Sequence, residues 1–194
     1  MDKQRIERLI KDYQEIRALE ERLGKTIGFK ARLIQDDRLN RYEIEVKIKT
    51  TIKNWKNNIQ IMEVPICFDI DLPTDYPNKP PKCQFYKQNS CKLFHPHLAS
   101  SIFSNGLTWQ NPFYNPADGL AQYVLNLIKS LQYNPDFIDI QAKNGNKTAM
   151  EWYIQKRRQD PSCFPTDKSL LPPSPKTFRM KEQTKSINQK KFII

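Results

Sequence analysis

Two long stretches of alternating residues constrain the fold of this chain more than any other feature. Every even position from 62 to 72 is apolar, and carboxylates occupy three of the odd positions between them. Residues 42–48 alternate in the same way. Because successive side chains of a strand point to opposite faces, both stretches are predicted as strands with one buried and one wet face. The polar, basic segment 49–58 between them is predicted as a hairpin loop.

Helices are predicted on both sides of these strands. Residues 3–23 carry apolar side chains at spacings of three and four, and Gly24 is expected to end that helix. Residues 115–131 form a second apolar stripe with Asn115 as its cap. A third helix is expected over 142–157. Between strands and helices, four prolines in the segment Pro73–Pro81 predict a rigid turn, and residues 83–87 a short strand.

The composition changes near the end of the chain. Residues 161–194 contain five prolines, and seven Lys/Arg against two Asp/Glu, without a sustained period. We therefore predict a folded domain over 1–158 and an extended basic arm over 159–194. Such an arm suits nucleic acid, acidic lipid or an acidic protein face, or it stays solvated. Interface candidates in the arm are Phe178, Arg179, Lys181, Lys190 and Lys191.

Composition excludes some classes of protein. No apolar run is long enough to span a bilayer, so no transmembrane segment is expected. The first 24 residues lack the apolar core of a secretory signal, and their five Asp/Glu by Glu20 argue against a cleavable mitochondrial presequence. We expect an intracellular protein, in the mitochondrion or in the cytoplasm or nucleus.

The four cysteines and two histidines do not match a common metal site. Cys91, His95 and His97 lie close in sequence, but no CxxC pair is present and the spacing fits no common zinc pattern. We expect no metal and no cofactor. The thiols are expected to be buried apolar groups in a reducing compartment.

Five landmarks, in order and spacing, resemble the ubiquitin-conjugating enzymes over roughly residues 3–157. They are Tyr76-Pro77-Asn78-Lys79-Pro80-Pro81, Phe94-His95-Pro96-His97, Gly106 followed by Trp109, Tyr114-Asn115-Pro116, and Ser130 to Asp136. The resemblance implies an α+β, UBC-like fold. Its expected elements are an N-terminal helix, a four-stranded antiparallel meander and C-terminal helices.

The departures from that family pattern lie at its reactive positions. Trp109 stands where the family has its nucleophilic cysteine, and His97 replaces the asparagine of the His-Pro-Asn motif. An indole offers no nucleophile, and no cysteine lies between Cys91 and Cys163. We disfavour Cys91 as a nucleophile because it precedes the motif. His95, Pro96, His97 and Trp109 are therefore predicted as degenerate active-site positions, with no catalytic residue.

Each of these residues also has a simpler interpretation. His95 is expected to brace its turn through a backbone hydrogen bond, and His97 to be a surface residue without a special role. Trp109 is expected to pack in the former cysteine groove or to anchor an interface. Trp55, in a basic loop, is expected to be exposed and to belong to an interface; base stacking there is a weaker alternative.

Four functions are open at this point. We favour a non-catalytic docking or structural subunit of a larger assembly, which could be organellar, such as a respiratory complex or ribosome. The alternative is an inactive variant that partners an active conjugating enzyme or binds ubiquitin. An active enzyme, and a protein that binds nucleic acid through the arm and the 47–57 loop, complete the set.

Overall fold

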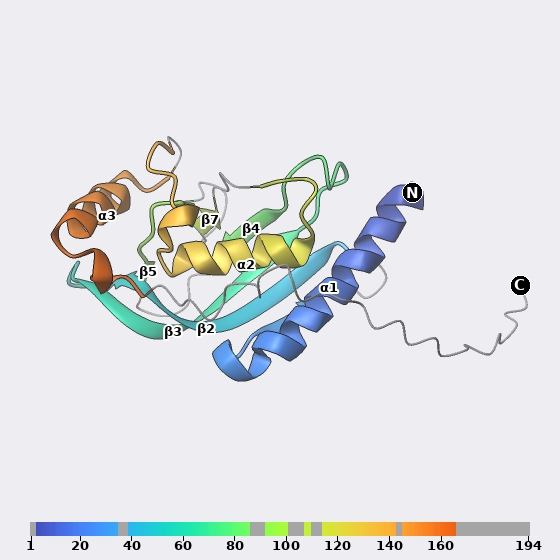
Figure 1. The fold of residues 1–194 in the computed structure, drawn as a ribbon, viewed down its shortest axis with the longest axis horizontal. Helices are drawn as coiled ribbons and strands as arrows, with labels where there is room; N and C mark the ends of the chain where they lie inside the picture. The colour runs from blue at the N-terminus through green and yellow to red at the C-terminus, as the bar shows by residue number, and fades with distance from the viewer. Residues whose placement is uncertain are drawn as a thin grey trace, which may run out of the picture.

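The protein consists of a curved antiparallel sheet with one helix across its face and one helix toward each end. The computed structural model describes residues 3–34, 39–85, 92–100, 107–109, 114–142 and 145–165. Helix α2 (Leu120–Leu131) lies over the long strands. Helix α1 (Lys3–Ile27) lies at one end of the molecule and α3 (Lys147–Gln159) at the other (Figure 1).

The sheet is a meander extended by short strands. Its path runs β1-β2-β3-β4-β7-β6, and β5 pairs with β2. All of these pairings are antiparallel. The bounds are β1 Lys30–Leu33, β2 Arg41–Lys53, β3 Ile59–Asp71, β4 Lys82–Phe85, β5 Lys92–Leu93, β6 Leu98–Ser100 and β7 Leu107–Trp109. The predicted four-stranded meander and N-terminal helix are confirmed.

The alternation decides which face of the long strands is buried. In β2 the side chains of Tyr42, Ile44, Val46 and Ile48 are at most 2% exposed, and they join the main core with α1 and α2. The predicted loop over 49–58 was wrong in its length. Strand β2 continues to Lys53 and β3 begins at Ile59, because these residues keep the ladder register with each other. Residues 54–58 alone make the turn.

The helices begin and end at other residues than predicted. Helix α1 passes through Gly24 and ends at Ile27, followed by Gly28 with φ of +59°, a left-handed conformation that suits glycine. Asn115 does not cap α2, which has Gly119 as its N-cap residue; Asn115 instead accepts the Ala117 N–H within the preceding turn.

The C-terminal part of the domain has its own small aromatic core. Helix α3 begins later than predicted, at Lys147, where the Asn146 side chain accepts the Ala149 N–H. The 3₁₀ turns η1 (Pro135–Phe137) and η2 (Pro161–Cys163) flank it in sequence. The second core is formed by Tyr133, Ile138 and Tyr153, with Met150, Trp152, Ile154 and Phe164 packed around them.

No helix within the described part of the chain is both long and apolar enough to cross a bilayer. The division at 158/159 remains a prediction, since residues 166–194 lie outside the described residues.

Candidate functional site

The His-Pro-His turn lies between β5 and β6, against the C-terminal end of α2. Its backbone begins at Phe94, whose N–H donates to the Thr51 carbonyl at 3.1 Å, and closes where the Leu98 N–H donates to the His95 carbonyl at 3.2 Å. Residues 94–98 are all buried. The turn is therefore part of the protein interior.

His95 is buried and is held at both ring nitrogens. Nδ1 accepts the His97 N–H at 3.1 Å, so the proton of the neutral ring resides on Nε2, which donates to the Ser130 carbonyl at 2.7 Å. The predicted backbone hydrogen bond of His95 is thus confirmed. Desolvation lowers the pKa of His95 well below 6.5; the neighbouring His97 adds to this, and the Ser130 bond opposes it.

His97 is not the surface residue that we expected. Its side chain is 0% exposed, and Nε2 accepts the Asp139 N–H at 3.0 Å. Burial lowers the pKa of His97 to about 4, although the Asp139 carboxylate acts in the opposite direction. The imidazole is therefore neutral at physiological pH and fixes the segment after η1.

Two carbonyl groups of the turn connect it to distant segments. The Phe94 carbonyl accepts hydrogen bonds from the Thr51 and Tyr133 hydroxyls. The Pro96 carbonyl, itself buried, accepts the Asn146 N–H at 2.8 Å. A Cβ at Gly145 would stand 1.9 Å from the Pro96 oxygen, so only glycine allows this approach. The turn thus joins β2, the end of α2 and the start of α3.

This geometry is that of a brace. General acid–base chemistry requires a group that reaches a substrate and titrates near the working pH. Both imidazoles are instead buried, and their pKa values are depressed. The backbone of Trp109 lies in β7, opposite Leu98 of β6. The side chain of Trp109 and the whole of Cys91 lie outside the described residues.

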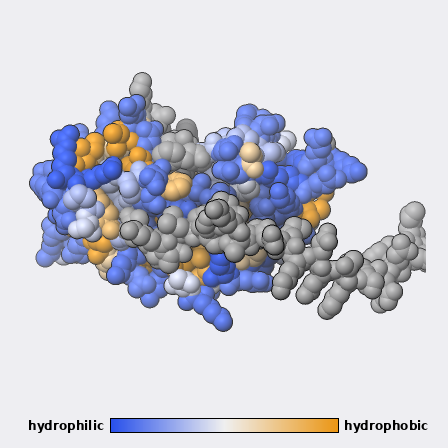
Figure 2. Space-filling view, viewed as in Figure 1, coloured by the Kyte–Doolittle hydropathy of each residue, from blue (hydrophilic) through white to orange (hydrophobic). Residues whose placement is uncertain are grey.

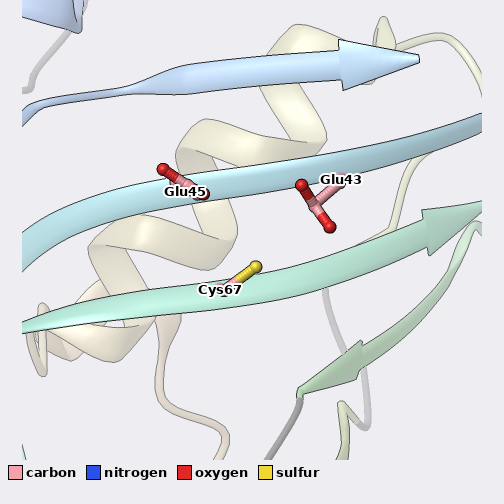
Figure 3. A group of neighbouring side chains, drawn as sticks. All are labelled: Glu43, Glu45 and Cys67. Carbon is pink, nitrogen blue, oxygen red and sulfur yellow. The ribbon is translucent and has the colours of Figure 1, made fainter. Parts of the chain in front are cut away.

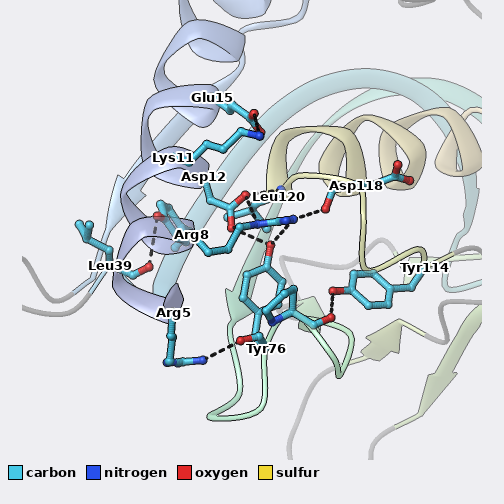
Figure 4. Close-up of polar contacts among 12 residues, drawn as sticks. Arg5, Arg8, Lys11, Asp12, Glu15, Leu39, Tyr76, Tyr114, Asp118 and Leu120 are labelled. Carbon is cyan, nitrogen blue, oxygen red and sulfur yellow. Dashed lines mark hydrogen bonds and ion pairs between the residues drawn. The ribbon is translucent and has the colours of Figure 1, made fainter. Parts of the chain in front are cut away.

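A second polar constellation, which was not predicted, surrounds the proline turn (Figure 4). Asp12 of α1 is 0% exposed. Its carboxylate accepts the Tyr76 hydroxyl at 2.7 Å, the Leu120 N–H at 2.9 Å and the Arg8 Nε–H at 3.0 Å. The only local signal was its place in the apolar stripe of α1, between Leu9 and Ile16.

The same helix also holds the backbone of the proline turn. The Arg5 guanidinium donates to the carbonyls of Pro73 and Thr74, both at 2.8 Å, and of Tyr76 at 3.1 Å. Burial and the bond to Asp12 raise the pKa of the Tyr76 hydroxyl, so it remains a donor. The proline turn, one of the five landmarks of the family resemblance, is therefore a docking point for α1.

Three side chains on the outer face of the sheet could approach a metal ion together (Figure 3). The ligand atoms of Glu43, Glu45 and Cys67 lie within 4.8 Å of one another. Each carboxylate already faces a cation, Arg32 for Glu43 and Lys30 for Glu45, both at 3.7 Å. Burial and the nearby carboxylates raise the pKa of the Cys67 thiol to about 11. These contacts do not favour a metal site.

The predicted interface residues separate into two groups. Trp55 lies in the β2–β3 turn and is 76% exposed, so its predicted exposure is confirmed. The candidates in the arm, from Phe178 to Lys191, lie outside the described residues. Trp55 belongs neither to the His-Pro-His turn nor to the Asp12 constellation.

The element order and the two turns define the protein as a UBC-like α+β domain. The model of the RWD domain family matches residues 13–132, and the chain belongs to this family. Among solved structures, human ubiquitin-conjugating enzyme E2 G1 is 23% identical, over 60% of this chain and 90% of that chain, with a TM-score of 0.38. No curated protein matches the chain. RWD domains mediate protein–protein interaction.

Proposed function

We propose that this protein is a non-catalytic RWD-domain protein that acts as a docking or structural subunit of a larger protein assembly. The observation that carries the proposal is the buried His-Pro-His turn, in which both imidazoles are neutral and bond to backbone groups. A turn engaged in this way supports a structural role. The tryptophan at position 109, in place of a nucleophile, supports the same conclusion.

The proposed assembly is one with acidic or RNA-rich faces. The chain has 32 Lys/Arg against 21 Asp/Glu, a net charge of +11, which supports association with surfaces of opposite charge. An organellar assembly, such as a respiratory complex or a ribosome, falls within this class.

A charging reaction tests the absence of catalysis. The purified protein is incubated with activating enzyme, ATP and ubiquitin or ubiquitin-like proteins, beside an active conjugating enzyme. We expect no reductant-sensitive thioester band for this protein. A band that disappears in Cys91→Ser would identify a nucleophile and refute the proposal.

Native affinity purification with mass spectrometry tests the role as a subunit. We expect a set of several proteins that co-purify in fixed ratios and co-migrate through size exclusion. A protein that migrates only as a free monomer under native conditions would contradict the proposal.

The second candidate is a partner of an active conjugating enzyme, or a ubiquitin-binding protein. Membership of the RWD family favours it, because RWD domains often interact with conjugating enzymes. Titration of the labelled protein with ubiquitin and with conjugating enzymes, followed by NMR, separates the two candidates. Saturable shifts with one conjugating enzyme, and a lone enzyme in the native purification, would favour the second.

A further inference from the structure

A groove lies between α3 and the distal half of the β2–β3 hairpin. It has a volume of about 450 Å³ and is lined by Ile59, Ile61, Trp152, Gln155, Lys156 and Gln159. Figure 2 shows apolar side chains exposed at this end of the molecule, among hydrophilic surroundings. The groove is far from the Asp12 constellation, which lies at the α1 end.

The floor of the groove combines apolar strand residues with a fixed aromatic ring. Ile61 is 37% exposed, although it is paired with Thr51 in the β2–β3 ladder, two residues from the start of β3. Trp152 packs edge-on against Phe94 at 5.9 Å and against Tyr133 at 6.0 Å. These contacts hold the indole in place, so the groove is formed before any partner binds.

The turn that precedes Ile59 displays a second tryptophan. The Asn54 side chain accepts the N–H groups of Lys56 at 2.9 Å and of Asn58 at 3.0 Å, which fixes the turn. Trp55 projects from it, with the Lys56 ammonium 4.7 Å from the ring centroid. An exposed tryptophan on a fixed turn is typical of an interface anchor.

The charge around the groove is positive. Lys156 is the charged residue among the described residues that line it, and no carboxylate lines it there. The hairpin adds Lys53, which pairs with Ile59, and Lys56 in the turn. Arg157 and Arg158 lie on other faces of α3: Arg157 contacts the Tyr153 ring, and Arg158 lines a separate hollow with Glu151. Asp160 follows α3, but its carboxylate accepts from the Ser162 N–H and hydroxyl.

We propose that this groove binds an acidic segment of a partner protein, with one apolar side chain of the segment seated between Ile61 and Trp152. The apolar floor suits a Leu or Phe anchor, and the basic rim suits Asp and Glu beside it. Single-stranded nucleic acid is the competing class, and it needs stacking platforms along a basic track. The recessed apolar floor favours the peptide.

A peptide-display experiment tests the proposal on the full chain. A library of random peptides of about 12 residues is selected on the wild-type protein, and affinities of the enriched peptides are measured by tryptophan fluorescence. We expect enriched peptides with several Asp/Glu around one large apolar residue, and weaker binding at high salt.

Matched variants locate the binding. We expect Ile61→Ser and Lys156→Glu each to weaken binding by about tenfold or more. Met62→Ser serves as the control for Ile61, because Met62 is similarly exposed, at 41% against 37%, and as the next residue of the strand it points to the opposite face. Lys3→Glu, in α1, is the charge control. Both controls should bind within about twofold of wild type.

Several results would overturn the proposal. These are an absence of enriched peptides, enrichment of neutral or basic ones, or equal affinity for the groove variants and their controls. Competition by a single-stranded oligouridine that requires Trp55 would assign the surface to nucleic acid instead. This proposal rests on the proposed function in one respect, namely that the partner is a protein. Failure here leaves native subunit association intact, whereas a thioester band would refute the function without affecting the groove.

Discussion

At the scale of single residues, His97 makes stability depend on pH. The folded protein holds this ring neutral with a pKa of about 4, whereas the unfolded chain protonates it near 6.5. Between these values the unfolded state binds more protons, so the free energy of unfolding falls as pH falls, by about 2–3 kcal/mol across the window. His95, with a pKa also depressed, contributes in the same direction.

The variant His97→Asn tests this dependence. An asparagine oxygen can accept the Asp139 N–H without titrating, so the loss of stability between pH 7 and pH 4.5 should be smaller than in wild type. Urea denaturation at several pH values measures the free energy of unfolding of both proteins. The contributions of the carboxylates, which the two proteins share, cancel in the difference. Parallel curves for the two proteins would show that His97 does not titrate as inferred.

Asp12 is the second residue with a large expected effect. Asp12→Asn removes the charge that balances Arg8, whose side chain is 18% exposed. Breaking a buried pair on one side costs about 3–5 kcal/mol of stability, and the double variant with Arg8→Met should recover part of this. Thermal and chemical denaturation measure both.

The control for Asp12 is Glu7→Gln, which removes an ion pair with Lys3 on the exposed side of the same helix. Exposed pairs contribute little, so no measurable change is expected. Equal effects of the two substitutions would mean that the network around Asp12 carries no special stability.

At the scale of elements, Gly145 sets how closely the loop before α3 approaches the His-Pro-His turn. Gly145→Ala places a Cβ against the Pro96 oxygen, a backbone atom that cannot move aside. We expect a destabilisation of about 1–3 kcal/mol in urea denaturation, and loss of protection of the Asn146 amide in hydrogen exchange. If the Asn146 amide of the variant exchanged at the wild-type rate, the close contact between Gly145 and Pro96 would be contradicted.

Gly24, unlike Gly145, has room for a side chain. It lies inside α1, and an added Cβ would meet the Phe29 carbonyl at an ordinary 3.5 Å. Gly24→Ala should therefore stabilise the protein by about 0.5–1 kcal/mol, because alanine has the higher helix propensity. Denaturant titration measures the gain, and a loss of stability would show that the helix is distorted at this position.

Sequence patterns predicted the type of most elements better than their ends. Alternation identifies β2 and β3 because one face of each strand is buried against helices. It could not show that β2 extends to Lys53, because polar residues there are held by pairing with β3 and with Lys92 of β5. Likewise Asn115 has the chemistry of a cap, yet α2 starts at Leu120, where the buried Asp12 carboxylate accepts the helix N–H.

At the scale of the whole molecule, the two cores predict two levels of stability. The main core joins the sheet with α1 and α2, whereas α3 is attached through the smaller aromatic cluster. Native-state hydrogen exchange should show faster exchange in α3 than in β2 and β3.

The variant Phe164→Ala tests whether the aromatic cluster sets the local stability of α3. Phe164 stacks on Tyr133 and contacts Tyr153, each at 5.1 Å between ring centroids. The substitution should accelerate exchange in α3 and leave the central strands unchanged. Equal acceleration in the sheet and the helix would indicate one cooperative unit.

The candidate site was less accessible to sequence analysis than the fold. The structural role of His95 follows from its motif, but the hydrogen-bond partner of the His97 ring is the Asp139 N–H, 42 residues further along the chain. Asp12 was missed for the same reason, because its partners are distant in sequence. The periodicity of apolar residues contains no information about such contacts, because the contacts form only when the elements pack together.

The distances along the chain within the Asp12 network have a consequence for biosynthesis. Tyr76 lies 64 residues and Leu120 108 residues after the carboxylate that they bond. At about 5–20 residues per second, a ribosome adds the second partner roughly 5–20 s after Asp12 is made. During that interval the apolar stripe of α1 lacks its native cover, which makes this helix the part of the nascent chain where a chaperone would bind first.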